Sequence, residues 1–116
     1  MKGVYVLVIK VTKDIKTKIG ALGNLKFEKG IYAYVGSAQN SLEKRIARHK
    51  TKNKKLFWHI DYLLKNRNVK ILKIFYKKAG KSEECRIAKR LSKINFPIPK
   101  FGCSDCKCET HLFKLK

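Results

Sequence analysis

Apolar positions in the first third of the chain form two nearly continuous runs without helical spacing. Gly3 to Val11 consists almost entirely of Val, Tyr, Leu and Ile, and the run that starts at Gly30 is rich in aromatic and β-branched residues. Such runs predict β-strands, and the first, being apolar at nearly every position, is expected to lie centrally with both faces covered. A turn signal at Gly36-Ser37 is expected to end the second strand.

Between these runs, Thr12 to Lys29 is long for a hairpin connection and contains Gly20 and Gly23. We therefore expect an elaborated loop with a short extra β pair around Lys18 and Phe27.

Helical spacing follows the second strand. Asn40 with Glu43 three residues later predicts a helix start, because each side chain can satisfy a backbone N–H of the first turn. The helix would carry Leu42, Ile46 and His49 down one side, and Arg45 and His49 would emerge together one turn apart. An Arg/His pair after a strand and a glycine turn suits phosphate binding, although an ordinary basic surface helix fits the same spacing.

The second half of the chain predicts two more helices and two more strands. Leu56 to Lys65 has a helical apolar stripe, and Val69 to Tyr76 has the alternation of a strand near the middle or edge of a sheet. Ser82 is expected to cap a helix that ends before Pro97, and Thr110 to Leu115 is expected to form a closing strand. The stripe of that helix places Glu84 on its inward face, together with Ile87, Ala88, Leu91 and Ile94.

These elements predict one α/β (α+β) domain over residues 1–116. It should contain a small three-stranded, mainly antiparallel sheet flanked by helices, with an added C-terminal strand. The three sheet strands are those that begin at Gly3, Gly30 and Val69.

The charge balance is far from even: 29 Lys and Arg face 8 Asp and Glu, which gives a net charge of +21 in 116 residues. Such a field attracts polyanions, so nucleic acid is the expected partner. An anionic membrane surface, or a host proteome rich in lysine, would also account for the composition. The apolar run Val4 to Ile9 is too short to cross a bilayer, so we expect a cytoplasmic protein.

Four cysteines occur without a secretory signal, which favours reduced thiols over a disulfide framework. Three of them, with a histidine, form a C-x2-C-x-C-x2-H pattern that suits tetrahedral zinc, and Cys85 could replace one ligand. The four candidate zinc ligands are Cys103, Cys106, Cys108 and His111. The competing interpretation is a loop in which Ser104, Asp105 and His111 line a functional cleft.

Several short motifs resemble those of a known superfamily. Tyr34-Val35-Gly36 followed by Arg45 and His49 resembles the second half of the GIY-YIG nuclease signature. Gly3-Val4-Tyr5 is the better match to the first half, because Gly30-Ile31-Tyr32 shares a strand with Tyr34.

Later segments resemble the DUF123 branch of that superfamily, whose members are described as Uri-type endonucleases. They are Trp58-His59-Ile60-Asp61-Tyr62, Glu84-Cys85, residues 101–108 and His111-Leu112-Phe113, so the resemblance spans nearly the whole chain. It implies a GIY-YIG-like fold and a metal-dependent endonuclease that hydrolyses phosphodiester bonds of DNA or another nucleic acid.

By the same resemblance, Tyr5 and Tyr34 would flank the attacking water and Arg45 would bind the phosphate. His49 would be an additional base or phosphate donor, and Glu84 would hold Mg²⁺ or Mn²⁺. Further nucleic-acid contacts are expected from Ser37, Lys44, Arg48, Lys50, His59, Asp61, Ser104, Asp105 and His111.

Structural roles remain open for the same residues. The two tyrosines could be core aromatics, and Glu84 could serve only the helix dipole. The alternative function is a non-catalytic nucleic-acid-binding module, with or without a stabilising zinc. A protein partner or a homodimer fits either function.

Overall fold

The computed structural model describes residues 2–51, 55–56, 58–102 and 110–115. Its main sheet has five strands in the order β5-β1-β4-β7-β6, and a second sheet pairs β2 with β3. The strands are β1 (Gly3–Val11), β2 (Ile15–Lys18), β3 (Asn24–Phe27), β4 (Gly30–Ala38), β5 (Val69–Lys77), β6 (Phe96–Pro97) and β7 (Leu112–Lys114). The helices are the short 3-10 helix η1 (Gly20–Leu22), α1 (Leu42–Lys50), α2 (His59–Leu64) and α3 (Ser82–Ser92).

The three predicted strands lie side by side in the sheet, with β5 at its edge. β1 lies between β4 and β5 and is antiparallel to both. Leu7, Ile9 and Val11 are completely buried on one face of β1, whereas on the other face Val6 and Val8 are half-buried and Lys10 is exposed. The central position of β1 is confirmed, but the prediction that both of its faces are covered is only partly correct. The mixed α/β class, the mainly antiparallel sheet and the extra β pair are therefore confirmed.

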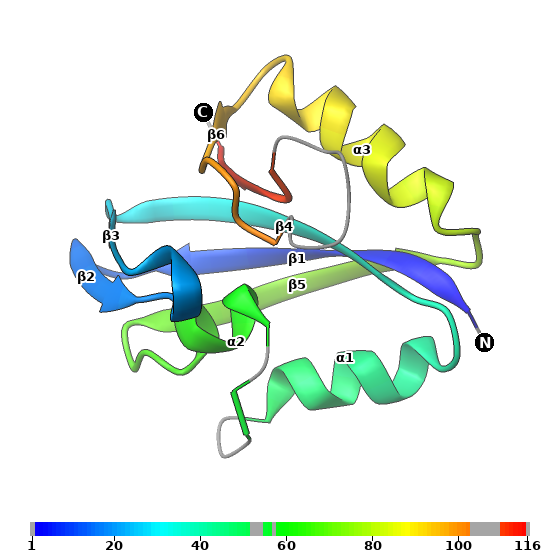
Figure 1. Cartoon of the computed structure of the whole chain (residues 1–116), viewed down its shortest axis with the longest axis horizontal. Helices are drawn as coiled ribbons and strands as arrows, with labels where there is room; N and C mark the ends of the chain where they lie inside the picture. The colour runs from blue at the N-terminus through cyan, green and yellow to red at the C-terminus, as the bar shows by residue number, and fades with distance from the viewer. Residues whose placement is uncertain (1, 52–54, 57, 103–109, 116) are drawn as a thin grey trace.

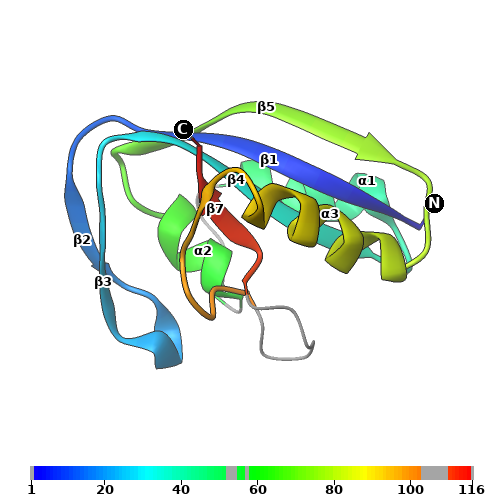
Figure 2. The ribbon, with the colours of Figure 1, turned by 90° about the horizontal axis from the view of Figure 1, so that it is seen from above.

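Figure 1 shows α3 on one face of the sheet and α1 with α2 on the other. The larger core lies on the α1/α2 face and contains Tyr5, Leu7 and Tyr34. A smaller core under α3 contains Val35, Ala88 and Phe113. Figure 2 shows the β2–β3 hairpin reaching away from one end of the sheet.

β4 does not end at Gly36-Ser37, so the predicted turn there is wrong. The strand continues to Ala38 because Gly36, Ser37 and Ala38 stay in register with β1. β7 pairs only with Tyr32, Ala33 and Tyr34. Among the described residues, no strand therefore pairs with the outer side of β4 after β7 ends.

The helix starts also differ from the predictions. Ser41, not Asn40, caps α1, since its backbone is extended and its side chain accepts the Lys44 N–H. α2 starts at His59, not at Leu56, because the Asp61 carboxylate accepts the Trp58 N–H at 2.8 Å and fixes the first turn there. Lys81, not Ser82, is the residue that precedes α3.

The C-terminal region contains one element more than the pattern predicted. α3 ends at Ser92, so Ile94 is 63% exposed and does not belong to the buried stripe. The two-residue strand β6 follows and pairs with β7. None of the helices that the structure describes is long and apolar enough to cross a bilayer.

Candidate functional site

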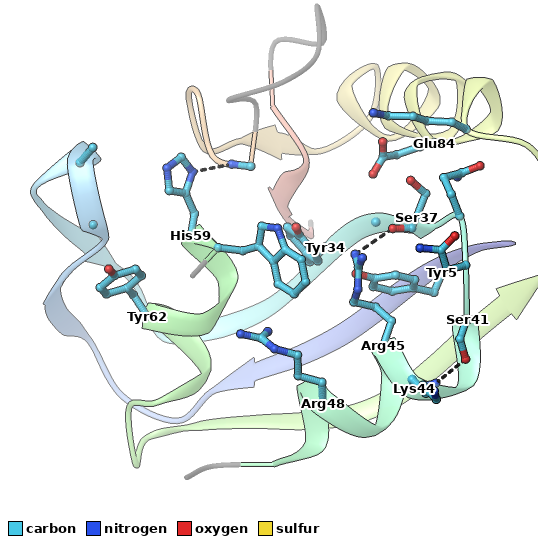
Figure 3. A pocket seen from close by; sticks show the side chains of 18 residues that line it. Tyr5, Tyr34, Ser37, Ser41, Lys44, Arg45, Arg48, His59, Tyr62 and Glu84 are labelled. Atoms are coloured by element: carbon cyan, nitrogen blue, oxygen red, sulfur yellow. Dashed lines mark hydrogen bonds between the residues drawn. The ribbon is translucent and has the colours of Figure 1, made fainter. Parts of the chain in front are cut away.

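A cavity of about 800 Å³ opens beside the outer edge of β4, beyond the end of β7. Residues of β1, β4, α1, α2, α3 and the η1 turn line it. Figure 3 shows side chains from both faces of the sheet converging on this cavity.

Tyr5 reaches the cavity because Gly36 stands opposite it. The two residues are register partners in β1 and β4. A Cβ on residue 36 would lie 2.4 Å from the Tyr5 Cζ and hydroxyl oxygen, so only glycine lets the ring cross β4 here. The Tyr5 hydroxyl lies 2.7 Å from His49 Nε2. Burial raises the pKa of Tyr5 to about 12, and the nearby Arg45 opposes the shift.

Tyr34 lies on the same face of the sheet as Tyr5. It pairs with Leu7, two residues after Tyr5 in β1, and side chains two residues apart along a strand share a face. Both phenols line the cavity. Burial holds the pKa of Tyr34 well above its usual value of 10, so both tyrosines keep their protons at neutral pH.

Two arginines of α1 stack on one indole ring at the cavity wall. The Arg45 guanidinium carbon lies 4.2 Å from the Trp58 ring centroid, and that of Arg48 lies 4.4 Å from it. Arg45 Nη1 also donates to the Ser37 carbonyl at 2.9 Å. These contacts fix the Arg45 cation next to Tyr5.

Arg48 is held by Asp61 through two parallel hydrogen bonds of 2.7 and 2.9 Å. The Asp61 carboxylate is completely buried and also accepts the Trp58 N–H. Asp61 is therefore buried and does not line the cavity, so its contacts in the structure are with Arg48 and Trp58, and the expected contact with nucleic acid stays a prediction. Arg48 itself lines the cavity, with part of its charge balanced by Asp61.

Glu84 enters the cavity from α3, on the opposite face of the sheet. It is 8% exposed and lies in the first turn of the helix, as the stripe predicted. Its Oε2 lies 3.5 Å from His111 Nδ1. That nitrogen also lies 3.1 Å from the Val35 carbonyl oxygen, to which a protonated Nδ1 can donate.

His49 lies behind Tyr5 and does not line the main cavity. Its side chain is 3% exposed and packs against the rings of Tyr5, Tyr34 and Trp58 at centroid distances of 5.3, 6.4 and 6.2 Å. The prediction that Arg45 and His49 emerge together is therefore wrong: the arginine reaches the cavity and the imidazole enters the core.

The family model described as "Domain of unknown function DUF123" matches residues 4–116. The chain belongs to the DUF123 family. No curated protein and no solved structure gave a significant match.

In this DUF123 chain, the remaining predicted residues divide into three groups. Ser37, Lys44 and His59 line the cavity. Lys50 lies outside it, beside His49 in a smaller cavity, and His111 is buried next to Glu84. Ser104, Asp105, Cys103, Cys106 and Cys108 lie outside the described residues.

The cysteine predictions change in one respect. Cys85 is disulfide-bonded in the structure, which contradicts the expected reduced thiol and removes Cys85 as a replacement zinc ligand. Within the described part of the chain, no group of three or more His, Cys, Asp or Glu could hold a metal ion.

Trp58 and Tyr62 also line the cavity, although the sequence pattern assigned neither of them a role in the site. The local pattern could not reveal the Trp58 contacts, because its two arginine partners come from α1 and meet it only in the folded chain. The WHIDY segment that carried the resemblance was the one available signal for this wall of the cavity.

The cavity of this DUF123 domain brings a fixed cation together with a buried tyrosine–histidine pair and one carboxylate. Arg45 supplies a fixed cation, and the Tyr5 hydroxyl with His49 offers a buried hydrogen-bonded pair. Glu84 is the only carboxylate among the described lining residues. One carboxylate fits the way Mg²⁺ binds, since that ion keeps several waters and takes further oxygens from a bound phosphate.

Proposed function

We propose that this DUF123 protein is a metal-dependent endonuclease with a GIY-YIG-like site, hydrolysing phosphodiester bonds of DNA or another nucleic acid. The observation that carries the proposal is the convergence of Tyr5, Tyr34, Arg45 and Glu84 in one cavity of a protein with a net charge of +21. Hydrolysis of a phosphodiester needs positive charge at the phosphate, a base for the attacking water and help for the leaving oxygen.

In this proposal, Arg45 holds the non-bridging oxygens of the phosphate. Its contacts with the Ser37 carbonyl and the Trp58 ring orient the guanidinium before the phosphate arrives. A preorganised cation stabilises the additional charge of the transition state without having to move. Lys44 and Arg48, which also line the cavity, add positive charge around it.

Tyr5 and His49 act together on the attacking water. With a pKa of about 12, the Tyr5 phenol is a weak acid that holds its proton at neutral pH. A neutral His49 can accept that proton at Nε2, 2.7 Å away, while Tyr5 accepts one from water. The proton lost by water thus ends on the buried imidazole, and no free phenolate is needed.

Glu84 would hold the divalent cation, Mg²⁺ or Mn²⁺, together with oxygens of the phosphate and water. When bound, such a cation supplies Lewis-acid stabilisation to the leaving oxygen. The neighbouring His111 can donate from Nδ1 to the Val35 carbonyl oxygen, 3.1 Å away, and the same nitrogen lies 3.5 Å from Glu84 Oε2, which fixes the carboxylate beside the cavity.

The test is cleavage of labelled duplex, single-stranded and branched DNA, with and without Mg²⁺ or Mn²⁺. We expect cleavage that requires the metal and falls roughly 100-fold or more in Arg45→Ala. Arg86→Ala is the matched control, because Arg86 is exposed on α3 and bonds only to Glu83 among its described contacts.

Two results would contradict the proposal. Equal cleavage by wild type, Arg45→Ala and Arg86→Ala would place the activity elsewhere or in a contaminant. Binding without cleavage of any substrate would favour the non-catalytic nucleic-acid-binding module.

A further inference from the structure

The cavity is larger than a phosphate and one cation require, and its two halves differ in chemistry. The charged half contains Tyr5, Ser37, Lys44, Arg45 and Glu84. The aromatic half contains His59 and Tyr62 of α2, with Gly20, Ala21 and Gly102 around them. Trp58 also lines the cavity with Arg45 and Arg48 stacked on its ring, and the charge of Arg48 is paired with Asp61. Figure 3 shows His59 and Tyr62 on one side of the cavity, Ser37 and Glu84 on the other, and Tyr34 and Arg45 between them.

His59 presents an uncharged hydrogen-bond donor. The Gly102 N–H donates to His59 Nδ1 at 2.8 Å, so Nδ1 carries no proton and the neutral ring carries its proton at Nε2. Burial also lowers the pKa of His59, which favours the neutral ring at pH 7. A neutral donor suits a carbonyl oxygen or ring nitrogen better than it suits a phosphate.

Tyr62 supplies an aromatic ring whose position is fixed by the η1 turn, which packs against it. Gly20 has a φ of +45°, and a Cβ there would lie 3.2 Å from Tyr62 Cε2. The backbone of the η1 turn is thus so close to the Tyr62 ring that even a methyl side chain at residue 20 would crowd it. A preformed aromatic surface of this kind is what proteins use to stack single nucleobases.

We infer that the aromatic half of the cavity binds one unpaired nucleobase next to the phosphate held in the charged half. The residues of the aromatic half carry no formal charge, provide a ring and offer one neutral donor, which matches a base and not a second phosphate. A base inside a duplex cannot enter such a cavity, so the substrate class is nucleic acid with an unpaired or extruded nucleotide beside the bound phosphate. The inference rests on the proposed function for the identity of the polymer, but not on cleavage.

The test compares two DNA duplexes of the same sequence, one fully paired and one with a single unpaired 2-aminopurine, titrated with the protein in EDTA. We expect the unpaired duplex to bind about tenfold more tightly. Tyr62→Leu should reduce this preference to about twofold or less, because the apolar volume remains and the ring is lost.

Two further variants make the result decisive. Tyr76→Leu is the matched control, since Tyr76 is 63% exposed on β5 and does not line the cavity; it should keep the full preference. His59→Asn keeps an acceptor for the Gly102 N–H but lacks the ring and Nε2–H, so it too should lose the preference even if Tyr62→Leu proves unstable.

No preference in wild type, or equal effects of Tyr62→Leu and Tyr76→Leu, would overturn the inference. A parallel reaction with Mg²⁺ separates it from the proposed function. Cleavage without any preference for the unpaired nucleotide would contradict the base site alone, whereas a preference without cleavage would contradict the hydrolase alone.

Discussion

Gly36 decides where the Tyr5 hydroxyl lies, although glycine carries no side chain to the site. Its missing Cβ leaves the space that the Tyr5 ring fills as it crosses β4 toward His49 and the cavity. The two residues face each other in the strand register, so this contact follows directly from the pairing of β1 with β4.

Gly36→Ala should displace the Tyr5 ring, because the new Cβ would lie 2.4 Å from the Tyr5 hydroxyl oxygen. We expect a loss of about 1–3 kcal/mol in the free energy of unfolding and a fall in cleavage rate, measured by urea unfolding and by the nuclease assay. Gly80→Ala is the control, since a Cβ at residue 80 meets no atom within 4 Å. Equal behaviour of the two variants would show that the close approach to Tyr5 has no effect.

Burial of the Tyr5 phenol also predicts a pH dependence of stability. The folded-state pKa of about 12 exceeds the unfolded value of 10, so the folded state binds more protons in this window. The stabilisation is therefore complete below about pH 10 and is lost as the pH rises toward 12.

Tyr5→Phe should remove this dependence. Relative to wild type, the variant should gain roughly 1 kcal/mol in the free energy of unfolding between about pH 9 and pH 11. The comparison uses urea unfolding of both proteins at each pH, so that titration of the lysines cancels. A constant difference between the two proteins over this range would contradict the buried-phenol assignment.

Among the elements, α1 and α2 are joined by the contact between Arg48 and Asp61. The Asp61 carboxylate binds Arg48 of α1 in a bidentate manner and also accepts the N–H of Trp58 at the start of α2. One buried carboxylate therefore positions both the ring on which Arg45 stacks and the helix that carries His59.

Asp61→Asn should weaken the charge-assisted bonds to Arg48 while nearly preserving the side-chain volume. We expect a loss of about 1.5–3 kcal/mol in the free energy of unfolding, measured by denaturant titration. Glu83→Gln is the control, because Glu83 pairs with Lys77 and Arg86 at the surface, and such pairs add little stability. If both variants lost the same stability, the contact between α1 and α2 would be no stronger than a surface ion pair.

Local pattern predicted the strands better than the helix starts. β1 matched its expected bounds because nine consecutive strand residues carry a nearly continuous apolar signal. The start of α2 was predicted too early because the cap that fixes it is a hydrogen bond from the Trp58 N–H to the Asp61 carboxylate. Strand β6 was not predicted because two residues are too few to show an alternating hydrophobic pattern. β4 continues beyond the turn that was predicted at Gly36-Ser37, because hydrogen bonding to β1 outweighs the local preference of Gly36 for a turn.

The inward position of Glu84 followed from the helical stripe, but the site as a whole could not be derived from the pattern. Glu84 lies on the α3 face and Tyr5 on the α1/α2 face, and both line one cavity beside the part of β4 that β7 does not pair with. The position of His49 behind Tyr5 likewise depends on how α1 packs on the sheet. Sequence spacing gave the correct face of the helix but not its neighbour.

For the whole molecule, lysines and arginines occur on β1, β2, β3, β5, β7, α1 and α3, whereas the cavity concentrates a few cations at one place. β5 lies at an edge of the main sheet and carries Lys70, Lys73 and Lys77, residues that disfavour pairing with the strand edge of another chain. These lysines contribute to the general field, and Lys44 contributes at the cavity.

DNA affinity should therefore fall linearly on a log–log plot against salt concentration. Lys44→Ala should make the slope shallower by about one, since it removes one phosphate contact at the cavity. Lys70→Ala, on the edge strand, should leave the slope nearly unchanged. Binding isotherms at several salt concentrations measure both slopes, and identical changes in the two variants would mean that DNA is not bound at the cavity.

The most direct measurement of the central claim is the single-turnover cleavage rate of Glu84→Gln beside Glu83→Gln at saturating DNA and Mg²⁺ or Mn²⁺. The two glutamates are neighbours on α3, but only Glu84 lines the cavity. Loss of its charge should slow cleavage by roughly 1,000-fold, and Glu83→Gln should stay within about twofold of wild type. A Glu84→Gln rate equal to that of Glu83→Gln would contradict the assignment of this cavity as the hydrolytic site.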